Sequence, residues 1–326
     1  MKGTAVDTAR RSPVPVSFFS IAVGSLALAG AWRVGERIWS LPGSLVTALT
    51  LGSLAIWLTI VAAYTHKWLS HRGEALAELR HPVQSSFAAL GPLSTLLAAQ
   101  GVYGYSHQAA FALFVIGAVA QIGLGAYLYG RFWQGGMKPE LFTPAMYLPT
   151  VAQNFVTGAT AALFGWTHVG AMFFGAGAIS WLVIESILLQ RAAVLHALPE
   201  VLRPTLGIQL APPVVGGVAY LSFTSGAPDL VAQLLLGYGL YQVLVLLRLL
   251  PWICKQPFAP SYWAFSFGVA ALPTMAMRMV ERGNAGPLGW LAPTLFVAGN
   301  VVIGILIMKT AALLMQGKLF SAAASN

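Results

Sequence analysis

Charged residues are scarce in this chain. Only 8% of its 326 residues are Asp, Glu, Lys or Arg, whereas 57% are hydrophobic, and the mean hydropathy is +0.74. A water-soluble surface cannot be built from so few charges. Apolar stretches of roughly 18 or more residues recur instead from end to end, each about long enough to cross a bilayer as a helix. The composition therefore indicates an all-α polytopic membrane protein.

Motifs for metal, thiol and nucleotide chemistry are also absent. Cys254 is the one cysteine, so no intramolecular disulfide can form, and the six histidines show no metal-ligand spacing. The chain has no CxxC pair, no HExxH motif and no phosphate-binding GxxxxGK[ST] loop. We therefore expect no cofactor, no enzymatic activity and no ATP-driven pumping. The net charge of +9 comes from basic residues scattered singly between apolar segments, which favours a lipid bilayer over nucleic acid as the partner.

The apolar segments predict ten membrane-spanning helices in a single domain over residues 17–317. Segments 1–16 and 318–326 flank that domain. Because ten is an even number, both termini are expected on the same side of the membrane. The predicted spans are residues 17–34, 43–66, 83–104, 107–129, 145–165, 169–190, 206–223, 229–250, 261–281 and 288–315.

Lys and Arg are divided unevenly between the two sides of this topology. The side with more of them is expected to be cytoplasmic, because short cytoplasmic loops carry an excess of basic residues. Both termini are therefore predicted to be cytoplasmic. The richer side holds Lys2, Arg10, Arg11, Lys67, Arg72, Arg80, Arg131, Lys138, Arg191, Arg203, Arg248, Lys255, Lys309 and Lys318, and the other side holds Arg33, Arg37, Arg278 and Arg282.

Prolines recur at a regular interval in the odd-numbered spans. Pro92, Pro149, Pro212 and Pro273 lie in spans 3, 5, 7 and 9 and are separated by 57, 63 and 61 residues. One further interval before Pro92 falls in span 1, where FSIAVGSLA aligns with FSFGVAALP of span 9. The chain is therefore predicted to contain five copies of one helical hairpin. All five would have the same orientation, which places them around a central axis.

The odd-numbered spans are also dense in small residues, whereas the even-numbered spans are bulky. Proline removes a backbone donor and frees a carbonyl, which is costly in hydrocarbon unless protein or water satisfies it. We therefore expect the odd-numbered spans to surround a pore and the even-numbered spans to face lipid. The alternative is that small residues and prolines only permit close helix packing.

Five motifs carry a likeness to a known family. They are FWQGG at 132–136, YLPTVAQNF at 147–155, LGIQLAPPVV at 206–215, LLRLLPW at 246–252 and WAFSFGVAAL at 263–272. From about residue 17 to 320 the chain resembles the slow-type anion channel and C4-dicarboxylate transporter family, which includes bacterial tellurite-resistance proteins. The resemblance implies a homotrimer of the bacterial inner membrane, whose protomers each arrange five hairpins around their own pore. It also implies that a phenylalanine on the ninth helix gates that pore.

The AFSFG motif places this gate at Phe267. A hydrophobic constriction of this kind closes a pore by dewetting or by a rotamer change. Span 1 departs from the family, with Ser20 and Ala22 where relatives often have Gly and Pro. The alternative is a packed core phenylalanine, which describes most of the 17 in the chain. The predicted pore-lining residues are Ser20, Ile21, Gly24, Pro92, Pro149, Pro212, Val215, Ala271 and Pro273.

Glu185 and Arg248 lie near the cytoplasmic ends of adjacent even-numbered spans. Ionisable residues within a membrane often mark a transport path, so a proton or substrate relay is one interpretation. The other is a structural ion pair that joins two outer helices. Their distance from the proposed axis favours the ion pair.

The sequence as a whole predicts a gated, passive channel for small anions. No ring of charges is apparent along the axis, with Arg278 expected only near the outer end of span 9, so weak selectivity based on size or dehydration is expected. The alternative is a secondary carrier for C4-dicarboxylates, tellurite or cationic drugs, which needs a saturable site and coupling to a gradient. Single-channel recording separates the two, because only a channel produces resolvable unitary currents.

Overall fold

The computed structural model describes residues 14–283 and 286–320, and this part of the chain is helical apart from short connections and contains no strand. Much of the predicted flanking segments 1–16 and 318–326, including Lys2, Arg10 and Arg11, lies outside the described residues. Within the described part, eight helical segments are long and apolar enough to cross a membrane. The predicted all-α polytopic membrane fold is confirmed.

The eight long segments fall into two groups by burial. Segments Val16–Trp39, Glu200–Phe223 and Pro260–Glu281 are 72%, 67% and 72% buried within the protein. The other five are only 22–28% buried, although they are at least as apolar. They are α2 (Gly43–Ser70), α6 (His107–Trp133), α8 (Thr167–Val194), α10 (Leu230–Ile253) and α12 (Leu288–Met315). An apolar helix that the protein does not cover is suited to lipid, so these five form the outer layer.

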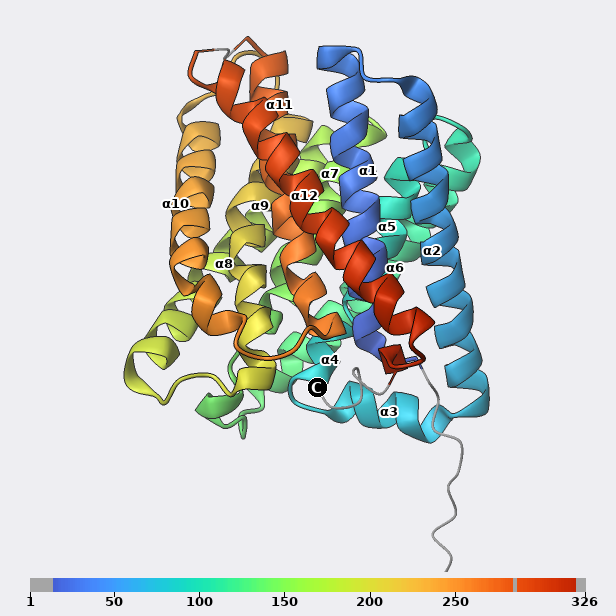
Figure 1. The fold of residues 1–326 in the computed structure, drawn as a ribbon, viewed down its shortest axis with the longest axis vertical. Coiled ribbons are helices and arrows are strands. Elements are labelled where there is room, and N and C mark those ends of the chain that lie inside the picture. The colour runs from blue at the N-terminus through green and yellow to red at the C-terminus, as the bar shows by residue number, and fades with distance from the viewer. Residues whose placement is uncertain (1–13, 284–285, 321–326) are drawn as a thin grey trace, which may run out of the picture.

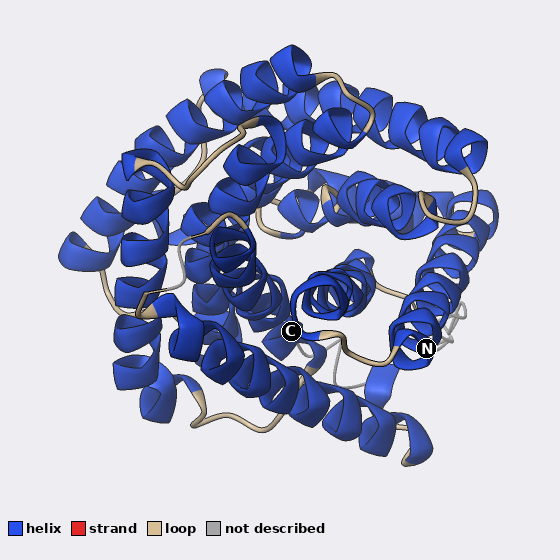
Figure 2. Cartoon of the chain, turned by 90° about the horizontal axis from the view of Figure 1, so that it is seen from above, coloured by secondary structure: helices blue, strands red, loops and turns tan. Residues whose placement is uncertain are grey.

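Five helices form a closed inner ring. They are α1 (Phe19–Trp39), α5 (Leu90–Val102), α7 (Gln153–Leu163), α9 (Ala211–Phe223) and α11 (Ser266–Glu281). Each packs against the next in this order, and α11 packs against α1 to close the ring. Viewed from above, this inner set is surrounded by the outer set (Figure 2).

Each outer helix packs on the inner helix that precedes it in the chain. Helix α2 packs on α1, α6 on α5, α8 on α7, α10 on α9 and α12 on α11. Helix α12 crosses the front of the bundle diagonally, over α11 and α1 (Figure 1). The outward faces of these helices expose large apolar side chains, among them Leu58, Ile116, Leu182, Leu244 and Val301.

The inner helices do not begin as regular α-helices. A 3-10 turn at Val16–Phe18 precedes α1, and longer 3-10 segments at Glu200–Leu210 and Pro260–Phe265 precede α9 and α11. Before α7 the chain forms a 3-10 turn and then a π-helical turn at Leu148–Ala152, which contains Pro149. Proline cannot donate the backbone hydrogen bond of a regular helix, which explains the change of winding.

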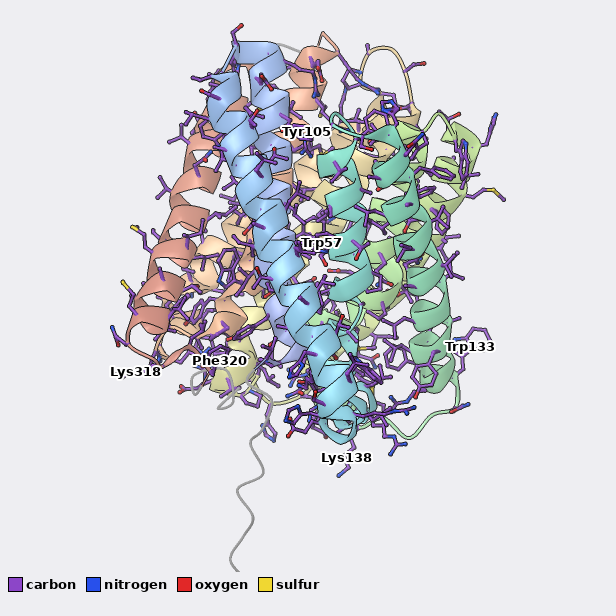
Figure 3. All side chains as sticks on the ribbon, turned by 90° about the vertical axis from the view of Figure 1, so that its right-hand side faces the viewer. Trp57, Tyr105, Trp133, Lys138, Lys318 and Phe320 are labelled. Carbon is purple, nitrogen blue, oxygen red and sulfur yellow. The ribbon has the colours of Figure 1, made fainter. Side chains whose placement is uncertain are left out.

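Because of these breaks, predicted spans 83–104 and 145–165 are not continuous helices. The first consists of α4 (Gln84–Phe87) and α5, and the second of the two turns and α7. Helix α3 (Arg72–Arg80) was expected as a loop, and it lies across one end of the bundle instead (Figure 1). Lys138 and Lys318 lie at that end, and Tyr105 at the other (Figure 3).

Candidate functional site

A cavity of about 440 Å³ lies inside the inner ring. All of its lining residues belong to α1, α5, α7, α9 and α11, and on each helix except α5 they include both apolar residues near the middle and residues near the C-terminal end. The five inner helices therefore run in the same direction around the cavity, with their C-terminal ends at its wide mouth. We call this space the axial cavity.

Helix α11 presents one regular stripe to the axial cavity. The lining residues Phe267, Ala271, Thr274 and Arg278 are spaced by four, three and four positions, which puts them on one helix face. The stripe starts with an aromatic ring, continues with two small residues and ends in a guanidinium group. Along this stripe the cavity is therefore apolar at one end and positively charged at the other.

Phe267 lies between the axial cavity and a second, much smaller one. The smaller cavity has a volume of about 20 Å³ and is lined by residues from the opposite ends of the inner helices and from the turns before them, including Ser20, Leu148 and Ile208. Phe267 lines both cavities and is 9% exposed. A volume of 20 Å³ holds about one water molecule. Phe267 is thus the residue that the linings of the two cavities share.

Close contacts on either side of Phe267 set its direction. A Cβ atom on Gly24 of α1 would lie 2.2 Å from Oγ of Ser266, so these two helices touch at that point. A Cβ atom on Gly268 would lie 2.8 Å from Cβ of Leu210, just before α9. Successive residues of a helix are separated by about 100°. With Ser266 held against α1 and Gly268 held against the start of α9, the residue between them faces the gap that these helices leave, which is the axis.

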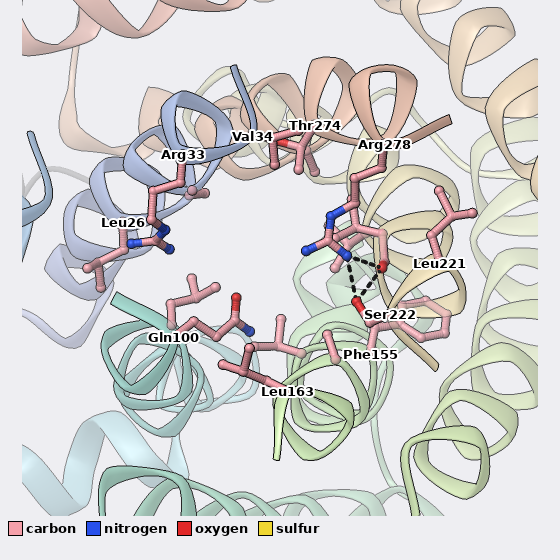
Figure 4. A pocket seen from close by; sticks show the side chains of 18 of the residues that line it. Leu26, Arg33, Val34, Gln100, Phe155, Leu163, Leu221, Ser222, Thr274 and Arg278 are labelled. Atoms are coloured by element: carbon pink, nitrogen blue, oxygen red, sulfur yellow. Dashed lines mark hydrogen bonds between the residues drawn. The ribbon is translucent and has the colours of Figure 1, made fainter. Parts of the chain in front are cut away.

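Two arginines reach into the axial cavity from opposite sides, Arg33 from α1 and Arg278 from α11 (Figure 4). Nη1 of Arg278 donates hydrogen bonds to Oγ of Ser222 at 2.7 Å and to the carbonyl oxygen of Val218 at 3.2 Å. These two arginines differ from the expectation of no ring of charge along the axis, and Arg33 is not among the predicted pore-lining residues. The signal that could have found Arg278 is its spacing of eleven residues from Phe267, which returns to the same helix face.

An ion pair joins α1 and α11 at the rim of the cavity. Nε of Arg37 lies 2.7 Å from Oε1 of Glu281, and Nη2 of Arg37 lies 3.2 Å from Oε2. The side chain of Arg37 is 50% exposed and that of Glu281 is 34% exposed. Exposed pairs of this kind contribute little to stability, so this one neutralises a rim charge more than it holds the helices together.

The structure places the other predicted pore-lining residues at different depths. Val215 and Ala271 line the axial cavity together with Phe267, and Ser20 lines the smaller cavity. Among the described residues that line these two cavities there are no members of the remaining set, Ile21, Gly24, Pro92, Pro149, Pro212 and Pro273.

Several residues of that set face neighbouring helices instead. Gly24 lies against Ser266 and Trp263. Pro273 lies beside Gly299 of α12, where a Cβ atom would be 3.6 Å from the proline Cγ. The carbonyl oxygen of Pro149 would lie 2.9 Å from a Cβ atom on Gly125 of α6, which is too close for any residue with a side chain. Pro149 and Pro273 of the inner layer thus pack against glycines of the outer helices, Gly125 and Gly299.

The structure does not pair Glu185 with Arg248, which corrects that expectation. The ion pairs of the described residues do not include either one, and Arg248 is exposed on α10. Glu185 contacts Tyr238 of α10, and Arg248 lies ten residues further along, roughly 15 Å away and on another face of that helix. The pair was predicted because both residues lie at a similar depth in the membrane. The two residues do not meet because Arg248 lies on a face of α10 that points away from Glu185.

Hydrogen-bond donors surround the Glu185 carboxylate. Oε2 accepts a hydrogen bond from the hydroxyl of Tyr147 and another from Nε1 of Trp181 at 3.2 Å, and Oε1 accepts one from the hydroxyl of Tyr238 at 3.1 Å. The Tyr147 hydroxyl also lies 3.0 Å from Oε1 of Gln209. Glu185 therefore links α8, α10 and the irregular segments before α7 and α9.

Replacing Glu185 by Ala is expected to lower the yield of folded protein and leave ion selectivity unchanged. Each buried donor left without an acceptor costs about 1–3 kcal/mol. The measurements are the monodisperse yield in detergent and the reversal potential in bilayers. Ser186→Ala is the matched control, because its hydroxyl bonds only to the carbonyl of Leu182 in its own helix. A selectivity change at normal yield would show that Glu185 belongs to the ion path.

A ring of five like-oriented helices around a cavity that carries arginines, inside a lipid-facing outer layer, defines the class as a multi-pass membrane channel or transporter. The sequence profile described as SLAC1, voltage-dependent anion channel, matches residues 13–311. The chain belongs to this family of anion channels and transporters.

Three relatives show the range of the family. The chain is 36% identical over 309 residues to the tellurite resistance protein TehA homolog of Haemophilus influenzae, covering 94% of this chain and 93% of the relative. It is 22% identical to the uncharacterized transporter MJ0576 of Methanocaldococcus jannaschii, covering 78% and 80%. It is also 22% identical to the guard cell S-type anion channel SLAC1 of Arabidopsis thaliana, covering 91% of this chain and 55% of the plant protein.

Proposed function

We propose that this chain is a gated, passive channel for small anions, with its pore inside the protomer and Phe267 as the gate. The observation that carries the proposal is the position of Phe267, whose ring lines both the axial cavity and the smaller cavity beyond it. The axial cavity that Phe267 lines is also lined by Ala27, Ala271 and Val215, which are small or apolar. A ring in such a tube excludes water, and an ion cannot pass until the ring moves.

The direction of the inner helices supports a channel over a carrier. Many secondary carriers bind their substrate at the midplane between inverted repeats that rock against each other. In this protein the five inner helices run in parallel around a single cavity, and a packed ring offers no pair of opposed halves. A carrier for C4-dicarboxylates, tellurite or cationic drugs remains the second candidate, and the name of the Haemophilus influenzae relative concerns tellurite resistance.

Planar-bilayer recording tests the proposal. A channel yields discrete unitary current steps, whereas a carrier completes its conformational cycle on the microsecond-to-second timescale and gives no resolvable step. Recordings on the parent and on a variant without the Phe267 ring distinguish the two candidates. Saturating flux without unitary steps from either protein would favour the carrier.

The proposed channel is a homotrimer of the bacterial inner membrane with both termini in the cytoplasm. The orientation is supported by the arrangement of basic residues, because Lys138 and Lys318 lie at the same end of the bundle as α3 with Arg72 and Arg80 (Figure 3). The mouth of the axial cavity, with Arg33 and Arg278, then faces outwards. The trimer is supported by the family resemblance alone, and each protomer holds a complete cavity.

Cysteine labelling is expected to show that the α3 end is cytoplasmic. In a Cys254→Ser background, a cysteine introduced by Ser70→Cys should react with a membrane-impermeant maleimide only after the cells are permeabilised. Tyr105→Cys, at the opposite end and 58% exposed, should react in intact spheroplasts. The physical reason is the excess of basic residues at the α3 end. Labelling of Ser70→Cys in intact spheroplasts would reverse the orientation.

A further inference from the structure

The mouth of the axial cavity carries two arginines, Arg33 and Arg278, whose positive charge no carboxylate in the cavity balances. Arg33, Arg37 and Arg278 line it, and the described lining residues include no Asp or Glu. Glu281 is bound to Arg37 at the rim, and Asp229 is bound to the hydroxyl of Tyr220 and to the start of α10. The remaining acidic group on these elements, Glu36, lies against Gly43 and outside the cavity lining.

Arg33 and Arg278 differ in what holds them. Arg278 is oriented by its hydrogen bonds to Ser222 and to the carbonyl of Val218, which leave part of its guanidinium group facing the cavity. The guanidinium group of Arg33 makes no hydrogen bond or ion pair with any described residue, although it projects into the same space. A guanidinium group has five N–H donors in a fixed plane. Because the guanidinium group of Arg33 has no acceptor among the described residues, its donors can bind an acceptor on a ligand.

The backbone makes this positive charge necessary for anion binding. The inner helices run with their C-terminal ends towards the wide mouth, and helix C-termini carry partial negative charge from unpaired carbonyls. Without the arginines the mouth would repel anions. Arg278 donates to the carbonyl of Val218 within the last two turns of α9, whereas the guanidinium group of Arg33 has no such acceptor among the described residues and is free to bind an ion.

We propose that Arg33 and Arg278 form a binding site for small oxyanions, such as nitrate or a monocarboxylate, in the axial cavity on the outer side of Phe267. The proposal rests on the proposed function as an anion channel. A guanidinium group offers two parallel N–H donors that match the two oxygens of a planar oxyanion, a geometry that a single spherical halide cannot exploit. The site concentrates anions next to the gate and repels cations from it.

The test measures the half-saturating nitrate concentration for current in the Phe267→Ala background, in which the pore is open. Arg33→Gln is expected to raise this concentration roughly tenfold, because it removes a charge-assisted pair of hydrogen bonds, and to shift the reversal potential towards lower anion selectivity. Arg33→Lys keeps the charge and loses the planar pair of donors. It is expected to weaken nitrate saturation several-fold and to leave chloride saturation close to that of the background.

Arg248→Gln is the matched control, because this arginine is exposed on α10 and away from the cavity. It should alter neither saturation nor reversal potential. If Arg33→Gln and Arg278→Gln both leave nitrate saturation unchanged, there is no site. If Arg33→Lys affects nitrate and chloride equally, the arginines act through charge alone and the oxyanion site is wrong.

A binding measurement keeps this test separate from the test of the channel. Nitrate that binds the folded protein raises its thermal midpoint in detergent. We expect sodium nitrate to stabilise the parent protein more than sodium chloride does, and Arg33→Gln to abolish the difference. Stabilisation that depends on Arg33 in a protein that never conducts would preserve the site and overturn the channel. Equal stabilisation of the parent and Arg33→Gln would overturn the site whether or not the protein conducts.

Discussion

Replacing Phe267 by Ala is expected to turn an occluded protein into a conducting one. Phe267 lines both the axial cavity and the smaller cavity, so we expect the loss of its ring to join the two. Conductance should rise about tenfold or more, the change produced when a barrier falls by about 1.4 kcal/mol. Planar-bilayer recording of purified protein in a sodium chloride gradient measures both this conductance and its selectivity.

The conductance of variants at position 267 should decrease as the volume of the side chain increases. Phe267→Leu leaves a smaller apolar plug, so conductance should fall from Ala to Leu to the parent Phe. Thr274 and Arg278, further along the same stripe, are unchanged in this series, so the charge of the cavity stays constant. A series in which Leu conducts as well as Ala would mean that the aromatic ring, and not its bulk, closes the passage.

Phe296 provides the matched control for this series. It lies on α12, is 8% exposed against 9% for Phe267, and packs against Trp32 and Trp39 away from both cavities. Phe296→Ala should cost about 3–5 kcal/mol of stability, as for a core phenylalanine, and create no current. The gate assignment is wrong if Phe267→Ala forms a normal oligomer and conducts no better than the parent.

Hydropathy and charge in the sequence were enough to predict the membrane fold. The outer helices α2, α6, α8, α10 and α12 lie within a few residues of predicted spans, because lipid on most sides requires an uninterrupted apolar run. The inner spans were harder to delimit. Their 3-10 and π turns depend on which backbone carbonyls form hydrogen bonds with neighbouring helices, and hydropathy does not predict those hydrogen bonds.

The rotation of each inner helix could not be read from local sequence. Gly24 and Ser266 fix how α1 meets α11 although they are far apart in the chain, and this contact turns Gly24 away from the axis. The same kind of contact directs Pro273 towards Gly299. Composition identified which spans contain small residues, but only packing decides which of those residues face a cavity and which face a neighbouring helix.

The partners of ionisable residues were also beyond the sequence. Glu185 is bound by Tyr147 and Tyr238, which lie 38 and 53 residues away and are not charged. Because only a residue of opposite charge at equal depth was considered as a partner for Glu185, the sequence pointed to Arg248. In contrast, Lys67 and Glu78 are only 11 residues apart. Their contact was not predicted because the segment between the spans was expected to be a loop, whereas it forms α3 and brings Glu78 to Lys67.

Breaking the contact between Lys67 and Glu78 is expected to destabilise the protein more than any other single change at the α3 end of the bundle. Nζ of Lys67 lies 2.8 Å from Oε1 of Glu78 and 3.1 Å from the carbonyl oxygen of Val14. The Glu78 carboxylate also accepts hydrogen bonds from the amide of Val16 and the hydroxyl of Tyr64, both at 3.3 Å. The pair thereby ties α2 and α3 to the chain that leads into α1.

Burial makes this pair sensitive to the loss of either partner. The side chain of Lys67 is 4% exposed and that of Glu78 is 12% exposed. Lys67→Met fills the same space and leaves the carboxylate without its cation, which costs about 3–5 kcal/mol for a buried pair. The thermal midpoint in detergent should fall by about 6 °C or more. Lys138→Met, at an exposed lysine of the same end, should change it little.

A double variant distinguishes the cost of an unpaired charge from the loss of a favourable contact. Lys67→Met with Glu78→Gln removes both charges. The amide oxygen of Gln can keep the hydrogen bond from the amide of Val16, while its amide nitrogen replaces the oxygen that faces the Tyr64 hydroxyl and can donate to that hydroxyl. Replacing a whole buried pair by neutral groups is often close to neutral, so the double variant should recover at least half of the lost thermal midpoint. A double variant no more stable than Lys67→Met would mean that the ion pair itself, and not the stranded carboxylate, holds α3 to the bundle. In either case single-channel conductance should match the parent's, because neither residue lines the axial cavity or the smaller cavity.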